Sequence, residues 1–544
     1  MLQKHSVFEE SRVDGSSDSE SDDIWHEAKE PNQLELDTLR HVSGKIPLTC
    51  WYIAVVELAE RFTYYGLSAP FQNYAQYSPD EFPRGVLNLD SHDATAITYF
   101  WQFWCFLSPL LGAVIADTYL GKYATICWFS GAYAVGMIVL FVTSIPEVGN
   151  YSVKFGGFLV GIIIIGLGTG GIKANISTLI ADQISGKTPR IKTLKSGERV
   201  IEDPSITVQN IFMLFYLMIN LGSLSVFATS ALEFEVGFWA AYLLPLCFFA
   251  VVPVFLYLGR NSYVKVPVGD KVIARAFKCT LIALRNRFDF SAAKPSLHPE
   301  SGFSWSDQFV DEVDRAVHAC KVFLFFPIFW LVYGQMISNF VAQAGQMESH
   351  GIPNDMLQAA NSIGIIILIP LCEFVVYPLI RRVTPFKAIT RIFWGFTVAS
   401  ILMVYAAILQ HFIYQAGPCY NNPLECAPEF RLIPNEVHVA IQIPAYAILA
   451  LSEILASVTG LEYAYTKAPA SMKSFIMALF LLTLAAGSAF GMALAPLNRD
   501  PHMVWTYSGL AIACFLTGCA FYLCFWRYNR REEEWNQMDY AKDD

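Results

Sequence analysis

Charge is scarce in this chain of 544 residues. Asp, Glu, Lys and Arg together make up 15% of it, whereas soluble domains carry about 25%. Hydrophobic residues make up 54%, and the mean hydropathy is +0.40. The shortage of charge excludes an ordinary soluble domain, and the net charge of -10 argues against a nucleic-acid partner. The composition is typical of a protein that crosses a membrane many times.

The chain also lacks the motifs of catalysis and of metal binding. It contains no nucleophile–base pattern, no phosphate-binding loop, and no cysteine or histidine spacing typical of zinc or haem. We therefore expect no enzyme activity, metal or cofactor. Most of the twelve cysteines lie in apolar runs, but Cys419 and Cys426 lie in the polar loop PCYNNPLECAP. If this loop faces an oxidising exterior, a disulfide between them is expected.

Apolar runs long enough to span a membrane, about 20 residues each, recur six times before and six times after one long polar segment. This pattern predicts an all-α polytopic membrane protein with twelve transmembrane helices in two six-helix bundles, and a site between the bundles. The expected divisions are an acidic disordered tail, a first bundle, an inter-bundle linker, a second bundle and a C-terminal tail: 1–47, 48–258, 259–317, 318–527 and 528–544.

Lysine and arginine predict the orientation. They are concentrated in the loops on one side of the predicted membrane, whereas the loops on the other side hold only Arg84, Lys154, Arg431 and Arg499. The positive-inside rule therefore places both termini in the cytoplasm. Residues 1–47 contain no apolar segment typical of a cleavable signal peptide. We expect an integral protein of the plasma membrane, targeted by its first helix.

The first apolar run contains the charged sequence ELAERFTYYGLS. Helical spacing places Glu57, Glu60, Arg61, Tyr64 and Ser68 on one face. Ionisable groups within a bilayer cost several kcal/mol, so they are kept for a purpose. That purpose is either a structural ion pair between helices or a functional site, and the surplus carboxylate favours the functional site.

Few other polar residues lie deep within the predicted spans. Lys173 follows four glycines in GLGTGGIKANIS, and it either pairs with an acid or a bound anion or extends to the membrane surface. Asn220 and Asn361 either join helices or bind a ligand. Glu453 lies in the tenth span, between Pro444, which weakens the helix ahead of it, and a later glycine.

These residues together suggest a chemistry. The deep cations are Arg61 and Lys173, while the deep anions are Glu57 and Glu60 in one half and Glu453 in the other. A cavity with opposite charges on its two sides suits a zwitterion. A carboxylate beside a guanidinium also gains proton affinity when the cation moves to a solute. The residues therefore indicate a proton-coupled carrier of a small dipolar solute.

Several motifs resemble those of one family. ELAERFTYYG resembles the ExxER(F)xYYG signature in the first helix of the proton-dependent oligopeptide transporter family, a branch of the major facilitator superfamily. FYLMINLGS is similar to the family's fifth-helix signature. GTGGIKANIS, QIPAYAILALSEILASVTGLEYAYTKAP and ASMKSF are similar to its helices 4, 10 and 11. GLSAPFQNY, FPIFWLVYGQ, AQAGQM and MALFLLT are similar to the fungal branch, and the resemblance covers roughly residues 45–530.

The resemblance implies a symporter that imports di- and tripeptides with protons by alternating access, and we expect it to function as a monomer in the lipid bilayer. Glu57, Glu60 and Arg61 would couple protons to transport. Asp117, in GAVIADTYLGKY, would help to lock the inner gate. The implied peptide-binding residues are Arg61 and Lys173 for the carboxylate, Asn220, Asn361 and Glu453 for the amino group and backbone, and Tyr64 and Trp330 for the pocket shape.

The sequence departs from the family pattern at five positions. Ser68 stands where many members have a basic residue, and Gly334 stands where an acid often pairs with the helix 4 lysine. Another acid would then have to release Lys173. Tyr99, Phe106 and Phe480 replace a histidine of animal members, a pocket tyrosine and a tryptophan. These changes leave side-chain preference open.

Two other functions remain open at this point. Members of the same family carry nitrate and other solutes in plants, although a nitrate carrier needs no acid equivalent to Glu453. A non-transporting nutrient sensor that signals through its tails is the other alternative, but it would leave the proton cluster unexplained.

Overall fold

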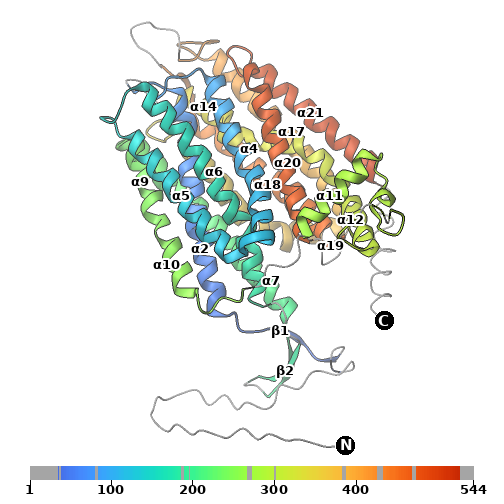
Figure 1. The fold of residues 1–544 in the computed structure, drawn as a ribbon. Helices are drawn as coiled ribbons and strands as arrows, with labels where there is room; N and C mark the ends of the chain where they lie inside the picture. The colour runs from blue at the N-terminus through green and yellow to red at the C-terminus, as the bar shows by residue number, and fades with distance from the viewer. Residues whose placement is uncertain are drawn as a thin grey trace, which may run out of the picture. The chain divides into compact units, whose positions relative to one another are not determined.

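The computed structural model describes residues 35, 38–79, 84–184, 189–194, 197–265, 272–298, 300, 302–382, 387–424, 433–467 and 473–526. The chain divides into two units (Figure 1). Unit 1 consists of Met1–Lys45 and Gly186–Gln209, and unit 2 of Ile46–Ser185 and Asn210–Asp544. Most of the predicted N-terminal tail, the predicted C-terminal tail and Cys426 lie outside the described residues.

Unit 1 contains a small sheet that the sequence analysis did not anticipate. Its strand order is β1-β3-β2, with β1 parallel and β2 antiparallel to β3, and His41 pairs with Ile201. An ion pair of 2.8 Å joins His41 Nδ1 to Asp203 Oδ2 beside this pairing. The strands are β1 (His41–Ser43), β2 (Arg190–Thr193) and β3 (Arg199–Asp203).

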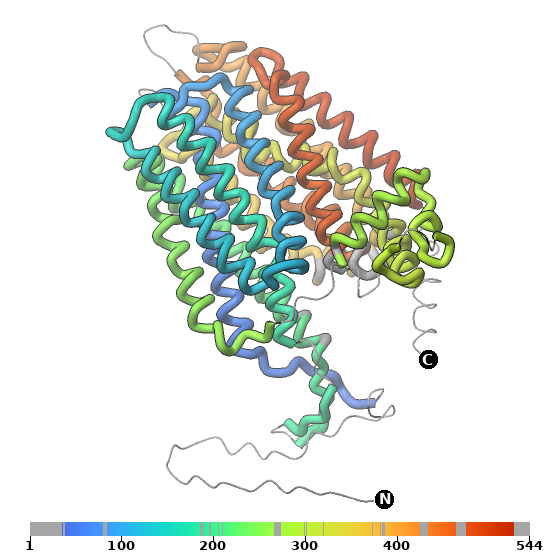
Figure 2. Tube along the Cα trace, in the orientation of Figure 1, coloured from blue at the N-terminus to red at the C-terminus, as the bar shows by residue number. Residues whose placement is uncertain are grey.

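The first half of unit 2 supplies the helices drawn from blue to green in Figures 1 and 2. Several apolar spans are interrupted, so one predicted span corresponds to two or more elements. They are α2 (Leu48–Ser68), α3 (Phe71–Gln76), α4 (Ser91–Ile115), η1 (Ala116–Leu120), α5 (Lys122–Ser144), α6 (Tyr151–Asp182), α7 (Pro204–Ser223), α8 (Ser225–Glu235), α9 (Phe238–Phe249) and α10 (Val251–Gly259).

The second half supplies the helices drawn from yellow to red (Figure 2). It is interrupted more often, and two of its breaks are π-helical turns, η7 and η9. The elements are η4 (Cys320–Phe325), α13 (Phe326–Tyr333), η5 (Gly334–Ile337), α14 (Asn339–Gly345), η6 (Met356–Gln358), α15 (Ala359–Leu371), η7 (Cys372–Val376), α16 (Tyr377–Arg381), α17 (Ala388–Gln415), η8 (Val439–Gln442), α18 (Ile443–Glu453), η9 (Ile454–Val458), α19 (Thr459–Lys467), α20 (Lys473–Leu494), η11 (Ala495–Leu497) and α21 (Met503–Phe525).

The polar segment between the halves folds into helices. α11 and α12 each bury an apolar face, and they pack against α19 and α20 of the second half. A two-stranded parallel pair, β4 and β5, lies elsewhere in the second half. These elements are α11 (Val272–Arg285), η2 (Phe290–Ala293), α12 (Asp307–Ala319), β4 (Met347–Glu348) and β5 (Asn435–His438).

The predicted fold class is confirmed. Within the described residues, 11 helices are long and apolar enough to cross a membrane. The expected first span, α2, has 21 residues but carries Glu57, Glu60 and Arg61. These three charges keep it from qualifying as apolar, although its length suffices for a span.

Glycine allows the first-half helices to approach closely. A Cβ atom at Gly112 of α4 would lie 2.6 Å from the carbonyl oxygen of Gly170 in α6. A Cβ atom at Gly171 would lie 2.0 Å from the ring of Phe129 in α5. Small residues permit such contacts between membrane helices. The four-glycine stretch before Lys173 therefore joins α6 tightly to its neighbours.

The two halves touch each other at one end of unit 2. We call this the Asn73 end, and the opposite end, where α2 begins, the Leu48 end. Asn73 and Asn354 exchange two side-chain hydrogen bonds of 2.8 Å across the halves. Further cross-half hydrogen bonds there are Thr95–Asn339 at 3.2 Å, Gln335–Tyr99 at 2.6 Å and Ser230–Asp355 at 2.6 Å. The Asn73 end is therefore closed in this conformation.

Candidate functional site

The charged residues of α2 form a buried ion-pair cluster. Glu57, Glu60 and Arg61 are 3%, 0% and 4% exposed. Arg61 Nε lies 3.2 Å from Glu57 Oε1, and its Nη2 contacts Glu60 Oε2. Both nitrogens therefore already face a carboxylate oxygen, and a further acceptor would compete with Glu57 and Glu60 for them. One guanidinium thus faces two carboxylates, as the helical spacing predicts.

A glycine of α7 makes room for this cluster. A Cβ atom at Gly222 would lie 2.7 Å from the Cβ of Arg61. This contact explains the glycine in FYLMINLGS, because any larger residue would push α7 away from α2. Asn220 lies two residues earlier and is buried. Its amide nitrogen donates to the carbonyl of Tyr216 at 2.9 Å, which leaves the side-chain oxygen as an acceptor.

Lys173 contacts aromatic rings. Its ammonium lies 3.9 Å from the centroid of the Phe106 ring and 5.6 Å from that of Tyr64. Within the described residues, no carboxylate lies at ion-pair distance from Lys173. Because Gly334 supplies no acid, we expected another acid to contact Lys173. The structure instead places the electron-rich ring faces beside the ammonium.

Three of the five deep charges line one cavity of about 200 Å³, whereas Glu60 and Glu453 do not. It is lined by Glu57, Arg61 and Lys173 from the first half and by α20 residues from the second. Lys173 therefore points into the interior of unit 2 and does not extend to a membrane surface. The cavity continues to Asp117 and Lys122 at the Leu48 end.

Asp117 lies in the π-helical turn η1 at that end, within the motif predicted to lock the inner gate. Its neighbour Lys122 makes an ion pair of 2.6 Å with Asp182 of α6, a partner that the sequence analysis missed. Both members of this pair belong to the first half. The gate role of Asp117 stays a prediction.

The second half contributes a separate acidic group. Asn361 of α15 donates to Glu453 Oε2 at 3.4 Å, and Tyr333 lies close enough to interact electrostatically with Glu453. Glu453 is the last residue of α18 and directly precedes the π-helical turn η9. Pro444 occupies the start of α18 and does not interrupt it. The irregularity beside Glu453 is therefore the π-turn, because proline is well accommodated in a first helical turn.

Tyrosines lie between the two charged groups. Tyr333 is close enough to interact electrostatically with Glu453 on one side and with Tyr64 and Tyr65 on the other. No role for Tyr65 or Tyr333 was predicted from the sequence. Tyr65 is part of the conspicuous YYG sequence, whereas Tyr333 lies in an apolar run with no distinguishing pattern.

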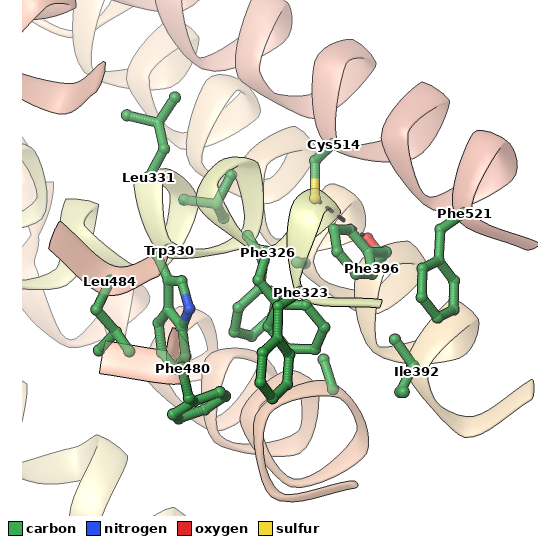
Figure 3. Close-up of a cluster of buried hydrophobic side chains, with 14 of the residues drawn as sticks. Phe323, Phe326, Trp330, Leu331, Ile392, Phe396, Phe480, Leu484, Cys514 and Phe521 are labelled. Carbon is green, nitrogen blue, oxygen red and sulfur yellow. Dashed lines mark hydrogen bonds between the residues drawn. The ribbon is translucent and has the colours of Figure 1, made fainter. Parts of the chain in front are cut away.

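Trp330 lies in the buried aromatic cluster of the second half (Figure 3). Its ring contacts those of Phe326 and Phe480, and its indole N–H donates to Thr483 at 3.1 Å. Phe480, which replaces the tryptophan of the family pattern, packs edge-on against Trp330 with a centroid distance of 5.7 Å. This packing fixes Trp330 one turn before the break at Gly334.

In the polar loop, Cys419 is disulfide-bonded. Its predicted partner, Cys426, lies outside the described residues. Cys419 is 6% exposed, and its backbone N–H donates to the side-chain oxygen of Asn435 at 3.0 Å.

Comparison with known proteins decides the family. The sequence pattern of the POT family matches residues 123–510. The chain belongs to the POT family. A peptide transporter of Candidozyma auris is 63% identical over 543 residues, which cover 100% of this chain and 92% of that protein. A peptide transporter of Saccharomyces cerevisiae is 59% identical over 94% of this chain and 85% of its own length.

Solved structures of POT family transporters share the fold. The crystal structure of the POT family transporter PepTSo matches with a TM-score of 0.70 and 24% identity, over 90% of this chain and 99% of that one. An auto-inhibited POT family peptide transporter matches with a TM-score of 0.70 and 23% identity, over 89% and 97%. These matches show that the chain has the fold of those transporters. Its family and its 11 apolar helices within the described residues make it an integral membrane protein.

Proposed function

We propose that this protein is a proton-coupled symporter that imports di- and tripeptides by alternating access. The observation that carries the proposal is the cavity between the halves, where Arg61 and Lys173 face the interior beside the acids Glu57 and Glu60. Close relatives that are peptide transporters support the choice of solute. A peptide with free ends carries the two opposite charges that such a cavity suits.

In this proposal, the peptide carboxylate binds Arg61 and Lys173. Within the described residues, Lys173 contacts ring faces and no carboxylate, so it has capacity for an anion, whereas at Arg61 the peptide carboxylate would compete with Glu57 and Glu60. A carboxylate accepts charge-assisted hydrogen bonds from both, which are roughly twice as strong as neutral ones. Binding at Arg61 weakens its hold on Glu57 and Glu60.

Proton coupling follows from that competition. A carboxylate that loses a neighbouring cation binds a proton more readily. The peptide and the proton therefore favour each other at the α2 cluster, because each releases one partner of the Arg61 ion pairs. A proton gradient can then drive accumulation of the peptide.

The amino end of the peptide meets the second half. Glu453 offers a carboxylate that accepts a hydrogen bond from Asn361, and Asn220 offers a side-chain oxygen. Tyr64 and Trp330 shape the pocket between these ends, the first stacked on Trp101 and the second fixed in the aromatic cluster. A peptide thus connects the two halves, which is what alternating access requires of a solute.

We further propose that the protein acts as a monomer in the plasma membrane with both termini cytoplasmic. The bundles 48–258 and 318–527 would alternate about the site, with 259–317 as their cytoplasmic linker and 1–47 and 528–544 as tails. The Leu48 end would then face the cytoplasm, and this conformation would be open inward. The asymmetry of lysine and arginine between the loops supports that orientation.

Uptake of a labelled dipeptide into proteoliposomes tests the proposal. We expect accumulation above equilibrium only with an inward proton gradient. A protonophore should reduce uptake to equilibration, and unlabelled dipeptide should compete. Gradient-driven uptake of nitrate without uptake of dipeptide would contradict the proposal in favour of another solute. Uptake of neither would favour a sensor.

A further inference from the structure

Two carboxyl groups from opposite halves meet at the Asn73 end. Glu233 lies in the last turn of α8 in the first half, and Asp355 directly precedes η6 in the second. Glu233 is 5% exposed and Asp355 is fully buried. Hydrogen bonds to neighbouring residues bring the two side chains together: Ser230, one turn before Glu233 on α8, donates to Asp355, and Asn73, which donates to Glu233, also bonds Asn354. Two ionised carboxylates buried in one such cluster would repel each other, which favours a proton on one of the two.

Each carboxyl also has its own donor. Asn73 Nδ2 donates to Glu233 Oε1 at 2.9 Å, and Ser230 Oγ donates to Asp355 Oδ2 at 2.6 Å. The remaining oxygens, Glu233 Oε2 and Asp355 Oδ1, are buried and lack a donor. A single shared proton would satisfy both, whereas two ionised groups would leave two buried charges in repulsion.

No positive side chain among the described residues is paired with either carboxyl, although Arg84 lines the same cavity as Glu233. Within the described residues, no lysine, arginine or histidine lies at ion-pair distance from either carboxyl. In the part of the chain that the structure describes, two buried tyrosines interact electrostatically with the pair, Tyr242 of α9 and Tyr446 of α18, and Tyr74 of α3 contacts the ring of Tyr242. The hydroxyl of Tyr242 interacts electrostatically with both carboxyls and has no hydrogen-bond partner. Burial raises the pKa of the Asp355 carboxyl.

A route to the pair exists. A cavity of about 40 Å³ is lined by Arg84, Glu233 and Asn354. Such a volume is sufficient for a water molecule. Arg84 is exposed, and it is the charged side chain that lines the cavity beside Glu233. Protons can therefore reach the pair from the Asn73 end without passing through the central cavity.

We propose that Glu233 and Asp355 form a second proton-binding site, which holds the Asn73 end closed with one proton bound and releases it when both carboxyls are ionised. The other buried contacts there join amides and hydroxyls, which do not titrate. The proton enters as the halves close and must leave before they reopen. This site goes beyond the α2 cluster and does not depend on which solute the protein carries.

The sign of the pH dependence follows directly. Acidic conditions keep one proton on the pair, so they favour the closed Asn73 end. As the pH rises and the shared proton is lost, both groups become ionised and the closed state loses its advantage. A second titratable contact across the halves, Arg499 to His92 at 3.2 Å, is exposed and does not touch the pair. It provides the matched control.

The test measures closure of the Asn73 end in the full chain, reconstituted in lipid nanodiscs without any peptide. Spin-labelled unnatural amino acids at the exposed positions Tyr151 and Leu497, one on each half, avoid the native cysteines. Distances between the labels are measured by pulsed electron resonance over a range of pH. For the parent protein we expect short distances at acidic pH and a growing long-distance population as the pH rises.

Glu233→Gln retains the size and supplies a permanent N–H donor to Asp355. We expect the closed population to persist to a pH about two units higher. Asp355→Asn supplies the equivalent donor from the other half and should shift the midpoint in the same direction. The test therefore still decides if one of the two variants does not fold. His92→Gln should leave the midpoint unchanged. An unchanged midpoint in both amide variants, or an equal shift in His92→Gln, overturns the proposal.

Infrared spectroscopy provides an independent measurement of the proton. The parent protein should show the C=O stretch of a protonated carboxylic acid that disappears as the Asn73 end opens. This band should be absent from Asp355→Asn combined with Glu233→Gln. A band that survives in the double variant would place the proton elsewhere and contradict the site. Because no peptide is used, failure here is distinct from failure of peptide transport.

Discussion

The ring of Tyr99 occupies the space beside Gly334. A Cβ atom at Gly334 would lie 2.6 Å from Cε1 of Tyr99, and the Tyr99 hydroxyl accepts a hydrogen bond of 2.6 Å from Gln335. Two departures from the family pattern are therefore linked. Gly334, at the start of η5, stands at the position where the family pattern often has an acid, and the ring of Tyr99 from α4 fills the space beside it.

This contact predicts that Gly334→Ala destabilises the protein. Overpacking of this kind costs about 1–3 kcal/mol, measurable as a lower thermal unfolding midpoint in detergent. Tyr99→Leu shortens the opposing side chain, so the double variant should lose less than the sum of the two single losses. Additive losses would show that the two residues do not compete for space.

The cluster on α2 predicts the effect of Glu60→Gln. The amide cannot exchange a proton, so accumulation driven by a proton gradient should disappear in proteoliposomes. Counterflow of peptide, which needs no net proton movement, should persist. Glu436→Gln, a change at an exposed carboxylate, serves as the matched control. Undiminished accumulation in Glu60→Gln would refute the coupling role.

The position of Lys173 predicts a preference among substrate ends. Lys173→Ala should weaken binding of a zwitterionic dipeptide by about 1.5–3 kcal/mol and affect a C-terminally amidated analogue less. Phe106→Leu removes the ring beneath the ammonium but keeps the charge, so the preference should survive. Binding of both ligands to each variant can be measured by calorimetry. Equal losses for the two ligands would assign Lys173 a structural role.

The carboxylate of Glu453 predicts a matched effect at the other end of the peptide. Glu453→Gln should weaken a zwitterionic dipeptide by about 1.5–3 kcal/mol. An N-acetylated dipeptide has no ammonium group, so its weak binding should change little. The cycle of protein and ligand changes isolates the contact. Additive losses around the cycle would rule out an ammonium contact and favour Glu453 as a proton site.

The spacing of residues close together in the sequence was sufficient to predict some of these features. The helical period alone places Glu57, Glu60 and Arg61 on one face, and the structure joins them in one cluster. The lengths of the apolar runs likewise indicated the membrane fold. Both inferences depend on residues close together in the chain.

Features that depend on distant residues escaped the sequence analysis. Glu233 and Asp355 lie in different halves, and nothing in the sequence around either one points to the other. The same is true of β1 and β3, which pair across a long separation. The aromatic partner of Lys173 was not predicted for another reason. A buried lysine suggests an acidic partner, but the face of an aromatic ring also accepts a cation.

The amide and hydroxyl contacts at the Asn73 end have an electrical consequence. Membrane voltage acts on charge that moves across the bilayer, at about 2.3 kcal/mol per elementary charge per 100 mV. Amides and hydroxyls such as those of Asn73, Asn354 and Thr95 carry none, so separating them moves no gating charge. At this end, voltage would then act on the Glu233–Asp355 pair and its proton, and elsewhere on the proton and the solute in transit, but not on these amide and hydroxyl contacts.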